Sequence, residues 1–219
     1  MDKLRMRFTK TGRAVYISHL DLMHTLQRGF SRAGYRLKYS EGFNPHPQIA
    51  IALPLSVGTG SVCELMDFRV AEELNLSDFP ARLSEALPEG LTVTEVYEPE
   101  RKASLLKWLE VDGQFEYDDR NPAEMAEKLT DFYAGEEIVI SKKTKRGVGE
   151  SDIRGAIREI RFSPEEAAVH VHAVISAQGP TLNPDLLAEA LRQLAPELTP
   201  DFAKFTRIET YDGDMKVFR

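Results

Sequence analysis

LRMRFTKTGRAVYISHLDLMHTLQRGFSRAG, residues 4–34, contains the two patterns that decide the fold. Apolar and polar side chains alternate over residues 4–10, which is the period of a half-buried strand. Ser18 and Asp21 have the spacing of a capping box that begins a helix, and Gly34 is a typical helix stop. The stretch therefore predicts a strand and then an amphipathic helix, whose polar side carries Asp21, Thr25, Arg28 and Arg32.

Strands and helices continue to alternate along the chain in two similar halves. After the opening helix, the first half is expected to form two strands, a helix and a strand, at residues 48–57, 62–70, 77–87 and 91–98. The second half repeats the full order, at residues 108–117, 121–135, 136–143, 167–176, 183–197 and 202–211. Each half reads β-α-β-β-α-β, so we predict an α+β protein with two tandem ferredoxin-like halves and antiparallel sheets.

This order also predicts the domain boundaries. Residues 1–98 form an N-terminal ferredoxin-like domain that carries the sequence GFNPHP at 42–47, and residues 99–107 are the linker. Residues 108–219 form the C-terminal domain. Residues 143–163 are expected to be a basic insertion between its second and third strands.

Composition predicts a soluble, cytoplasmic globular protein. The chain has 219 residues, of which 42% are hydrophobic, enough for one large domain or two small ones. No apolar run is long enough to cross a membrane, and the first residues lack the apolar core of a secretory signal. The single cysteine, Cys63, excludes an internal disulfide and a cysteine-built zinc site, so we expect a small buried hydrophobe there.

Charge is distributed unevenly. The net charge of −7 argues against a nucleic-acid binder, but residues 1–60 hold nine basic and three acidic residues, a balance of +6. The remaining residues hold 19 basic and 32 acidic ones, a balance of −13. Within that acidic part, residues 142–161 hold seven basic and three acidic residues, a balance of +4. Such runs are usually solvated faces, but two basic islands lining one cleft would attract a polyanion.

The GFNPHP loop is the first candidate site. Two prolines stiffen it and present His46, unless they simply end a strand edge and leave this histidine solvated. The start of the opening helix, with His19 and Arg13, is a second candidate because helix N-termini favour anions, although Ser18 and Asp21 are also explained by capping alone. We expected these two places to converge on one anionic group. The residues proposed to bind RNA or another anion in this half are Arg13, Tyr16, His19, Arg28, Phe43, Asn44 and His46, with Tyr39 as a further stacking residue.

The basic insertion is the third candidate. Gly147 and Gly149 suit a flexible loop that closes over a polyanion, and Asp152 is expected to pair with Arg154 at its far end; a charged loop without a ligand is the alternative. The proposed anion-binding residues are Lys142, Lys143, Lys145, Arg146 and Arg154.

The histidines do not predict a metal site. His19 and His24 are five residues apart, whereas a zinc pair on one helical face is four apart. His170 and His172 share one strand face, where an exposed polar surface is the favoured interpretation over a shared metal. We therefore expect no metal and no other cofactor.

Residues 7–34 of the opening stretch and YSEGFNPHPQIAIALPLSVG at 39–58, followed by ELMDF at 64–68, resemble a radical-SAM-linked family of bacterial proteins of unassigned function. The segment KKTKRGVGESDIRGAI, residues 142–157, is similar to a basic segment of the same family. Family members are encoded beside a radical SAM protein or fused to its C-terminus, so the resemblance implies a radical SAM partner. This chain has no cluster-binding cysteine triad, so any radical chemistry must take place on that partner.

Three classes of function remain open. The favoured one is a non-catalytic accessory that binds structured RNA, either tRNA or rRNA, for a radical SAM modification enzyme. The second is a metal-independent RNA-processing or RNA-modifying enzyme that uses His19 or His46 as acid or base, since tandem ferredoxin-like halves resemble CRISPR-type endoribonucleases and tRNA pseudouridine synthases. Against it, the chain lacks the Arg-Thr-Asp stretch of the latter and the C-terminal glycine-rich loop of the former. The third is a protein-interaction module that binds no nucleic acid.

Overall fold

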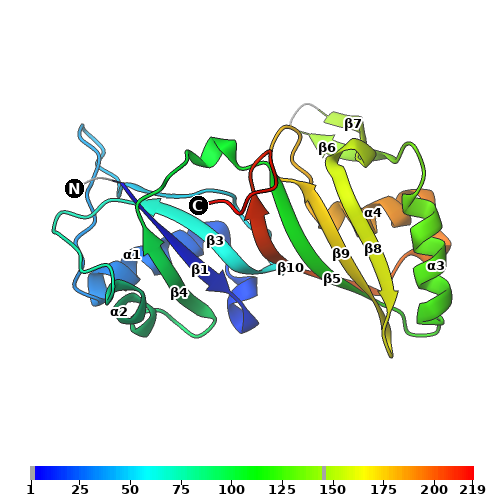
Figure 1. Cartoon of the computed structure of the whole chain (residues 1–219), viewed down its shortest axis with the longest axis horizontal. Helices are drawn as coiled ribbons and strands as arrows, with labels where there is room; N and C mark the ends of the chain where they lie inside the picture. Colours follow the sequence, from blue (N-terminus) through cyan, green and yellow to red (C-terminus); the bar gives the residue numbers. More distant parts are fainter. Residues whose placement is uncertain (1–2, 145–146) are drawn as a thin grey trace. The chain divides into compact units, whose positions relative to one another are not determined.

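The protein is an α+β protein with antiparallel sheets and four α-helices in the part that the computed structural model describes, residues 3–144 and 147–219 (Figure 1). Its chain divides into two compact units. Unit 1 comprises residues 1–105 together with 218–219, and unit 2 comprises residues 106–217. Within the described ranges, no helix is both long and apolar enough to cross a membrane.

Unit 1 contains an antiparallel sheet with helices on one face. Its strands lie in the order β4-β1-β3-β2, with β1 flanked by β3 and β4. The elements of the unit are β1 (Leu4–Lys10), η1 (Gly12–Tyr16), α1 (His19–Arg32), β2 (Ile49–Ile51), β3 (Gly60–Phe68), α2 (Phe79–Glu85), β4 (Leu91–Tyr97) and η2 (Ala103–Leu105).

The alternation in residues 4–10 positions the core of unit 1. Leu4, Met6 and Phe8 are buried in one cluster with apolar residues from β3, β4 and both helices. Helix α1 starts as predicted, because the Ser18 hydroxyl oxygen accepts from the backbone N–H of Asp21 at 3.2 Å and donates to its carboxylate at 2.7 Å. Arg5 and Arg7 point to the opposite face of the sheet, which carries no helix of this unit.

One glycine of unit 1 is required by a close backbone approach. The carbonyl of Gly90 accepts from the N–H of Thr11 at 2.8 Å, just before β4 returns beside β1. Gly90 has a φ of +89°, and a Cβ there would lie 2.2 Å from the Thr11 carbonyl oxygen. Only glycine combines this conformation with this contact.

Unit 2 contains a second antiparallel sheet, with strand order β10-β5-β9-β8. Helices α3 and α4 pack on it through their buried apolar residues (Figure 1). The elements of the unit are β5 (Trp108–Glu116), α3 (Pro122–Tyr133), β6 (Val139–Thr144), β7 (Gly147–Asp152), η3 (Arg154–Ala156), β8 (Ile157–Pro164), β9 (Ala168–Ser176), α4 (Asp185–Leu194), η4 (Pro196–Leu198) and β10 (Phe202–Tyr211).

The insertion of unit 2 differs from the one expected at 143–163. Residues 139–144 and 147–152 pair with each other as the hairpin β6–β7, in a separate two-stranded sheet. The strand beside β9 is instead β8, residues 157–164, which lies inside the expected insertion. The sequence was misleading because β8 is an edge strand whose apolar residues are interspersed with Arg158, Glu159 and Arg161.

Candidate nucleic-acid interface

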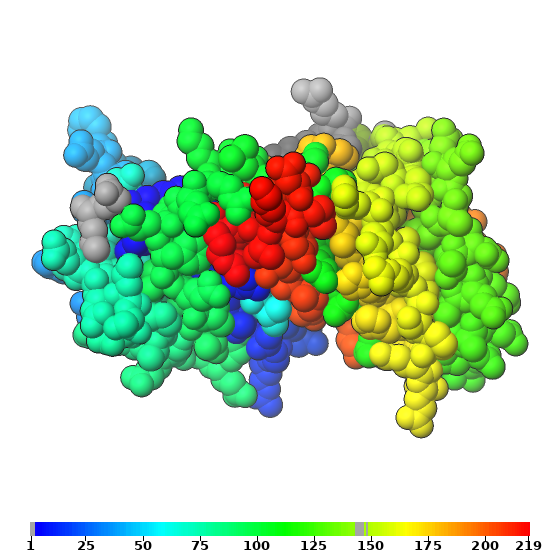
Figure 2. Space-filling model, in the orientation of Figure 1, coloured from blue at the N-terminus to red at the C-terminus, as the bar shows by residue number. Residues whose placement is uncertain are grey.

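The GFNPHP loop is closed by its own residues. Tyr39 and Pro47 pair at its base, and the N–H of Ser40 donates to the carbonyl of His46 at 2.8 Å. The Ser40 hydroxyl contacts Nδ1 of His46 at 2.9 Å and accepts from its backbone N–H at 3.1 Å. Figures 1 and 2 show that this loop stands out from the surface of unit 1. His46 is therefore exposed, but its ring is held by Ser40 within the loop.

The start of α1 lies at the other end of the unit 1 sheet. Leu4 is opposite Phe68 and Lys10 is opposite Ser61, so η1 and α1 begin beyond the end of β1 that adjoins the start of β3. The base of the loop pairs with the end of β3, at Phe68 and Val70. Seven strand residues, about 20 Å, separate these ends. The expectation that Arg13, His19, Asn44 and His46 converge on one anion is therefore wrong.

A basic groove of about 800 Å³ lies between the end of α1 and the segment that follows it. We call it the unit 1 groove. Three arginines and two tyrosines line it, and none of the lining residues is acidic: they are Gln27, Arg28, Ser31, Arg32, Gly34, Tyr35, Arg36, Leu37 and Tyr39. Arg28 and Arg32 are four residues apart on α1 and so lie on one helical face.

The arginines of the groove differ in how firmly they are held. Arg32 donates to the carbonyl of Ala86 from Nε at 2.9 Å and from Nη2 at 2.6 Å, while Arg36 pairs with Glu72 at 3.3 Å. Arg28 is exposed, and across residues 3–144 and 147–219 no hydrogen bond or ion pair engages its side chain. A phosphate would thus meet Arg32, held by two hydrogen bonds, Arg36, in a surface ion pair, and Arg28, which is available to move.

Exposed aromatic rings adjoin these arginines. Tyr39 belongs both to the groove and to the base of the loop, and 56% of it is exposed. Phe43, at the loop tip, is fully exposed. Since a basic groove beside exposed rings suits both phosphates and bases, the loop and the groove together form a candidate nucleic-acid interface.

Tyr16 and the residues at the start of α1 do not contribute to this interface. Tyr16 ends η1 and is exposed, and Arg13 and His19 are exposed beside it. Of the residues proposed for the first half, Arg28 belongs to the groove, Phe43, Asn44 and His46 belong to the loop, and Tyr39 belongs to both.

The basic hairpin of unit 2 is attached to α4. The N–H of Ser141 donates to the side-chain oxygen of Gln193 at 2.8 Å, and the amide of Gln193 donates back to the Ser141 carbonyl at 3.1 Å. Lys142 is exposed on β6, and Lys143 follows it on the same strand. Lys145 and Arg146 lie outside the described residues.

Asp152 and Arg154 are not paired through their side chains as expected. Backbone N–H groups of Ile138 and Arg154 donate to the Asp152 carboxylate at 3.0 and 2.9 Å, and these hydrogen bonds lower the pKa of that carboxyl. The guanidinium of Arg154 donates instead to the carbonyls of Gly135 and Ile157, both at 3.1 Å. Both side chains therefore hold the ends of the hairpin in place.

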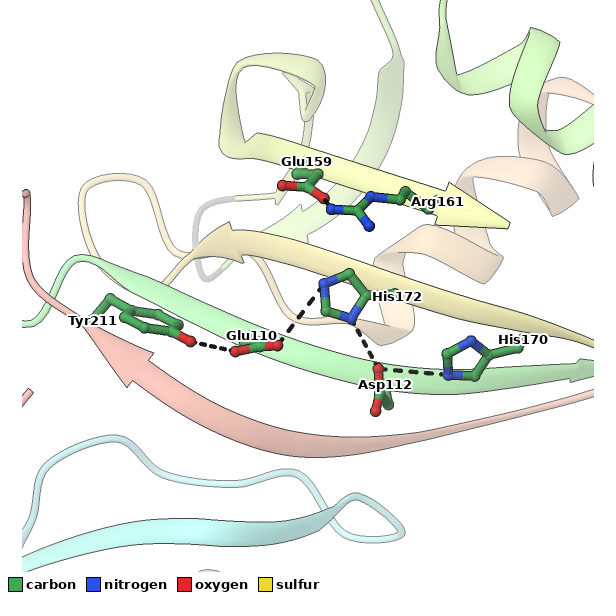
Figure 3. Close-up of polar contacts among 7 residues, drawn as sticks. All are labelled: Glu110, Asp112, Glu159, Arg161, His170, His172 and Tyr211. Atoms are coloured by element: carbon green, nitrogen blue, oxygen red, sulfur yellow. Dashed lines mark hydrogen bonds and ion pairs between the residues drawn. The ribbon is translucent and has the colours of Figure 1, made fainter. Parts of the chain in front are cut away.

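A row of polar side chains lies on the sheet of unit 2 (Figure 3), where the sequence indicated the shared face of His170 and His172 but not their carboxylate partners. His172 Nδ1 lies 3.0 Å from Oδ1 of Asp112, and Nε2 of His170 lies 3.5 Å from the same oxygen. Glu110 lies 3.9 Å from Nε2 of His172 and accepts a hydrogen bond from the hydroxyl of Tyr211. The signal was present, because polar residues alternate with apolar ones in both β5 and β9.

The strand register explains how this row forms. Asp112 and His172 are direct partners across β5 and β9, and Arg161 is the partner of His172 on β8. Because the apolar residues of β5 face the helices, its carboxylates must share the other face with the histidines. Within the described parts of the chain, no group of three or more acidic, histidine or cysteine residues is arranged to hold a metal ion.

The fold and these surfaces define an α+β protein with two antiparallel sheets and an arginine- and tyrosine-lined groove. The chain belongs to a bacterial family described as "Uncharacterized protein conserved in bacteria (DUF2344)", whose model matches residues 3–184. This confirms the predicted bacterial family of unassigned function. Among curated proteins, none matches the chain.

Similarity to solved structures shows the fold alone. A chain from the structure described as "Crystal Structure of a Cbf5-Nop10-Gar1 Complex" is 11% identical with a TM-score of 0.51, over 97% of this chain and 50% of that one. This protein therefore spans about half the length of that solved chain. An unknown protein from Galdieria sulphuraria is 9% identical, over 94% of this chain and 97% of that one, but its TM-score is only 0.27.

Proposed function

We propose that this protein is a non-catalytic cytoplasmic accessory that binds structured RNA, tRNA or rRNA, for a radical SAM modification enzyme. The observation that carries the proposal is the unit 1 groove, where three arginines and two tyrosines line one concave surface without an acidic residue. Guanidinium groups pair with phosphates through planar, charge-assisted hydrogen bonds, and tyrosine rings stack on bases. The loop with Phe43 would extend this surface by a further ring.

In the proposed function, the two units are the framework that carries the RNA-binding residues. Each sheet has the strand order expected when a β-α-β-β-α-β chain folds antiparallel, if the hairpin β6–β7 is set aside. This order supports our proposal that both units are ferredoxin-like. The hairpin adds Lys142, Lys143, Lys145, Arg146 and Arg154 to the proposed RNA-binding residues, and Arg13, Tyr16 and His19 form a separate basic surface at the start of α1.

The radical SAM partner is proposed from the family resemblance. Cys63 is 1% exposed and is the only cysteine, so this chain cannot ligate an iron–sulfur cluster through thiolates. An accessory that presents RNA would leave the radical chemistry to that partner. Affinity purification of this protein from native cells should recover a radical SAM protein together with RNA.

Binding of purified tRNA tests the groove directly. Arg28→Ala should weaken binding and reduce the slope of log affinity against log salt by about one, because one phosphate contact is lost. Lys128→Ala, at an exposed position on α3, is the matched control and should leave both quantities unchanged. If wild-type protein binds neither tRNA nor rRNA fragments at low salt, the proposal fails.

A second candidate function is supported by the Asp112–His172 pair. An imidazole oriented by a carboxylate is a common arrangement for a general acid or base, so a metal-independent RNA-processing or RNA-modifying enzyme would use His172 in place of His19 or His46. Incubation of tRNA with the protein should then give a cleaved or modified product. The enzyme hypothesis requires that this product is lost with His172→Gln and kept with His24→Gln, a change at an exposed position on α1.

A further inference from the structure

Arg5 lies in a row of polar residues on the helix-free face of the unit 1 sheet. It is the direct partner of Asp67 on β3 and of Tyr97 on β4. Nε of Arg5 donates to Asp67 Oδ1 at 2.6 Å, and Nη2 donates to Oδ2 at 3.2 Å. This fork fixes the plane of the guanidinium on the sheet.

The third nitrogen of this guanidinium is left unsatisfied. Arg5 is completely buried, yet Nη1 has no hydrogen-bond partner among the residues that the structure describes. The same holds for the hydroxyl of Tyr97 beside it. Buried donors without partners are costly, so a pair of them in one place indicates a group that is absent.

An aromatic ring from a distant part of the sequence covers this place. The Arg5 guanidinium lies over the ring of Phe218, 5.3 Å from its centroid, and that of Arg101 lies over the same ring at 4.9 Å. Phe218 is 0% exposed. We call the place between Arg5, Tyr97 and Arg101 the Arg5 slot.

Phe218 fits this slot only in part. Its ring provides the face on which guanidinium groups stack, but it has no acceptor for Nη1 of Arg5. A nucleobase provides both, because Arg101 can stack on its π-face while a carbonyl or ring-nitrogen acceptor on its edge accepts from Nη1 of Arg5. Guanidinium groups also stack well on bases, which makes this slot chemically better matched to a base than to phenylalanine.

The segment that carries Phe218 is held by a turn, by an isolated bridge between Tyr211 and Val217, and by contacts of Arg219. Residues 212–217 form a turn in which Asp212 accepts from the N–H groups of Asp214 and Lys216. Beyond it, Arg219 lies 3.6 Å from Glu95 and donates to the carbonyl of Phe218. Two guanidinium groups contact the ring of Phe218, and a competing ring can replace these contacts.

We propose that the Arg5 slot is a binding site for an unpaired RNA base, and that Phe218 occupies it until such a base displaces the ring. The inference rests on the proposed RNA-binding function and extends it to a single-stranded segment of the RNA. Bound base and bound Phe218 exclude each other, so removal of the phenyl ring raises the affinity for single-stranded RNA.

Fluorescence anisotropy with labelled hexauridine tests whether an RNA base and the ring of Phe218 compete for the Arg5 slot. Phe218→Ala should bind this probe at least about fivefold more tightly than wild type, in the range of ordinary coupling between competing sites. Phe218→Tyr is the matched control and should bind like wild type, because its ring still fills the slot. The double variant Arg101→Ala, Phe218→Ala should bind the probe less tightly than Phe218→Ala alone, with the increase in affinity lost. Equal or weaker binding by Phe218→Ala, with the protein folded by circular dichroism, overturns the inference.

A measurement on wild-type protein covers the case in which Phe218→Ala does not fold. Photocrosslinking with hexauridine that carries a 4-thiouridine should label peptides from β1 and β4, which contain Arg5 and Tyr97. Labelling confined to other peptides overturns the inference. If tRNA binding still depends on Arg28, that result leaves the proposed function intact; if tRNA does not bind at all, the proposed function fails with it.

Discussion

Nδ1 of His172 lies 3.0 Å from a carboxylate oxygen of Asp112, its direct partner on the neighbouring strand. An ionised carboxylate only accepts hydrogen bonds, so this imidazole nitrogen must carry the proton. When the ring is neutral, this contact favours the Nδ1–H tautomer, and Nε2 lies 3.9 Å from a carboxylate oxygen of Glu110. Such an orientation is what a base needs if this row acts on a substrate.

Replacement of Asp112 by alanine should release the tautomer of His172. NMR of the imidazole nitrogens should show the Nδ1–H form in wild type and a mixture of both forms in Asp112→Ala. His24, exposed on α1, serves as the internal control and should not change. Identical spectra of His172 in the two proteins would mean that Asp112 does not position this ring.

The pair formed by Arg5 and Asp67 should make unit 1 sensitive to acid. Burial alone would raise the pKa of the Asp67 carboxyl, but the hydrogen bonds from Arg5 and Lys3 outweigh it, and the resulting pKa lies below the ordinary value of 3.8. An acid with a lowered pKa in the folded state stabilises the protein above its unfolded pKa. That contribution is lost as the pH falls below about 4.

Asp67→Asn should therefore lower the free energy of unfolding at neutral pH by about 3–5 kcal/mol, since the buried Arg5 loses its partner. Urea denaturation at several pH values measures this, and the variant should also lose part of the wild-type dependence on acid pH. Asp131→Asn, at an exposed position on α3, is the control. A variant as stable as wild type would show that Arg5 does not depend on Asp67.

Strands that alternate cleanly were predicted from the sequence, and the strand that does not was missed. Residues 4–10 and 108–116 form β1 and β5, because each has one apolar face that packs on helices. β8 was missed because an edge strand tolerates charge on most of its residues. No local pattern distinguishes it from a basic loop.

The burial of a polar side chain by residues far away in sequence could not be predicted from the sequence pattern either. Alternation places Arg5 on the face away from the helices, where a solvated side chain is expected, yet Arg5 is completely buried and its guanidinium lies over the ring of Phe218. Among the residues of the unit 1 groove, Arg28 and Tyr39 were indicated by the sequence, whereas Arg36 reaches the groove by the path of the chain after α1. Both features depend on contacts between residues far apart in sequence.

The hydroxyl of Ser18 should stabilise the first turn of α1. Ser18→Ala removes the acceptor for the N–H of Asp21 and should lower the free energy of unfolding by about 1 kcal/mol, measured by urea denaturation. Ser18→Thr keeps a capping hydroxyl and should cost less. If the two variants are equally destabilised, the cap is not the cause.

Tyr117 should make unit 2 sensitive to alkali. Burial raises the pKa of its phenol to about 12, and its hydroxyl donates to the carbonyl of Leu198 at 2.8 Å. A group whose pKa is raised on folding stabilises the protein below its unfolded pKa, so this contribution is lost as the pH rises from about 10 towards 12. Thermal denaturation across this range should show a smaller loss in Tyr117→Phe than in wild type. Tyr16→Phe, at an exposed position, should follow the wild type.

Variants at the tip of the GFNPHP loop can separate an effect on RNA binding from an effect on the stability of the protein. Phe43 is fully exposed, so Phe43→Ala should leave the melting temperature unchanged. If its ring stacks on a base, the same change should weaken tRNA binding by about 1–3 kcal/mol. His46→Ala removes the ring that contacts the Ser40 hydroxyl, so we expect weaker RNA binding with little change in stability, because the side chain is exposed. A fall of several degrees in melting temperature with tRNA affinity intact would show that the loop serves the fold of unit 1 and not an RNA ligand.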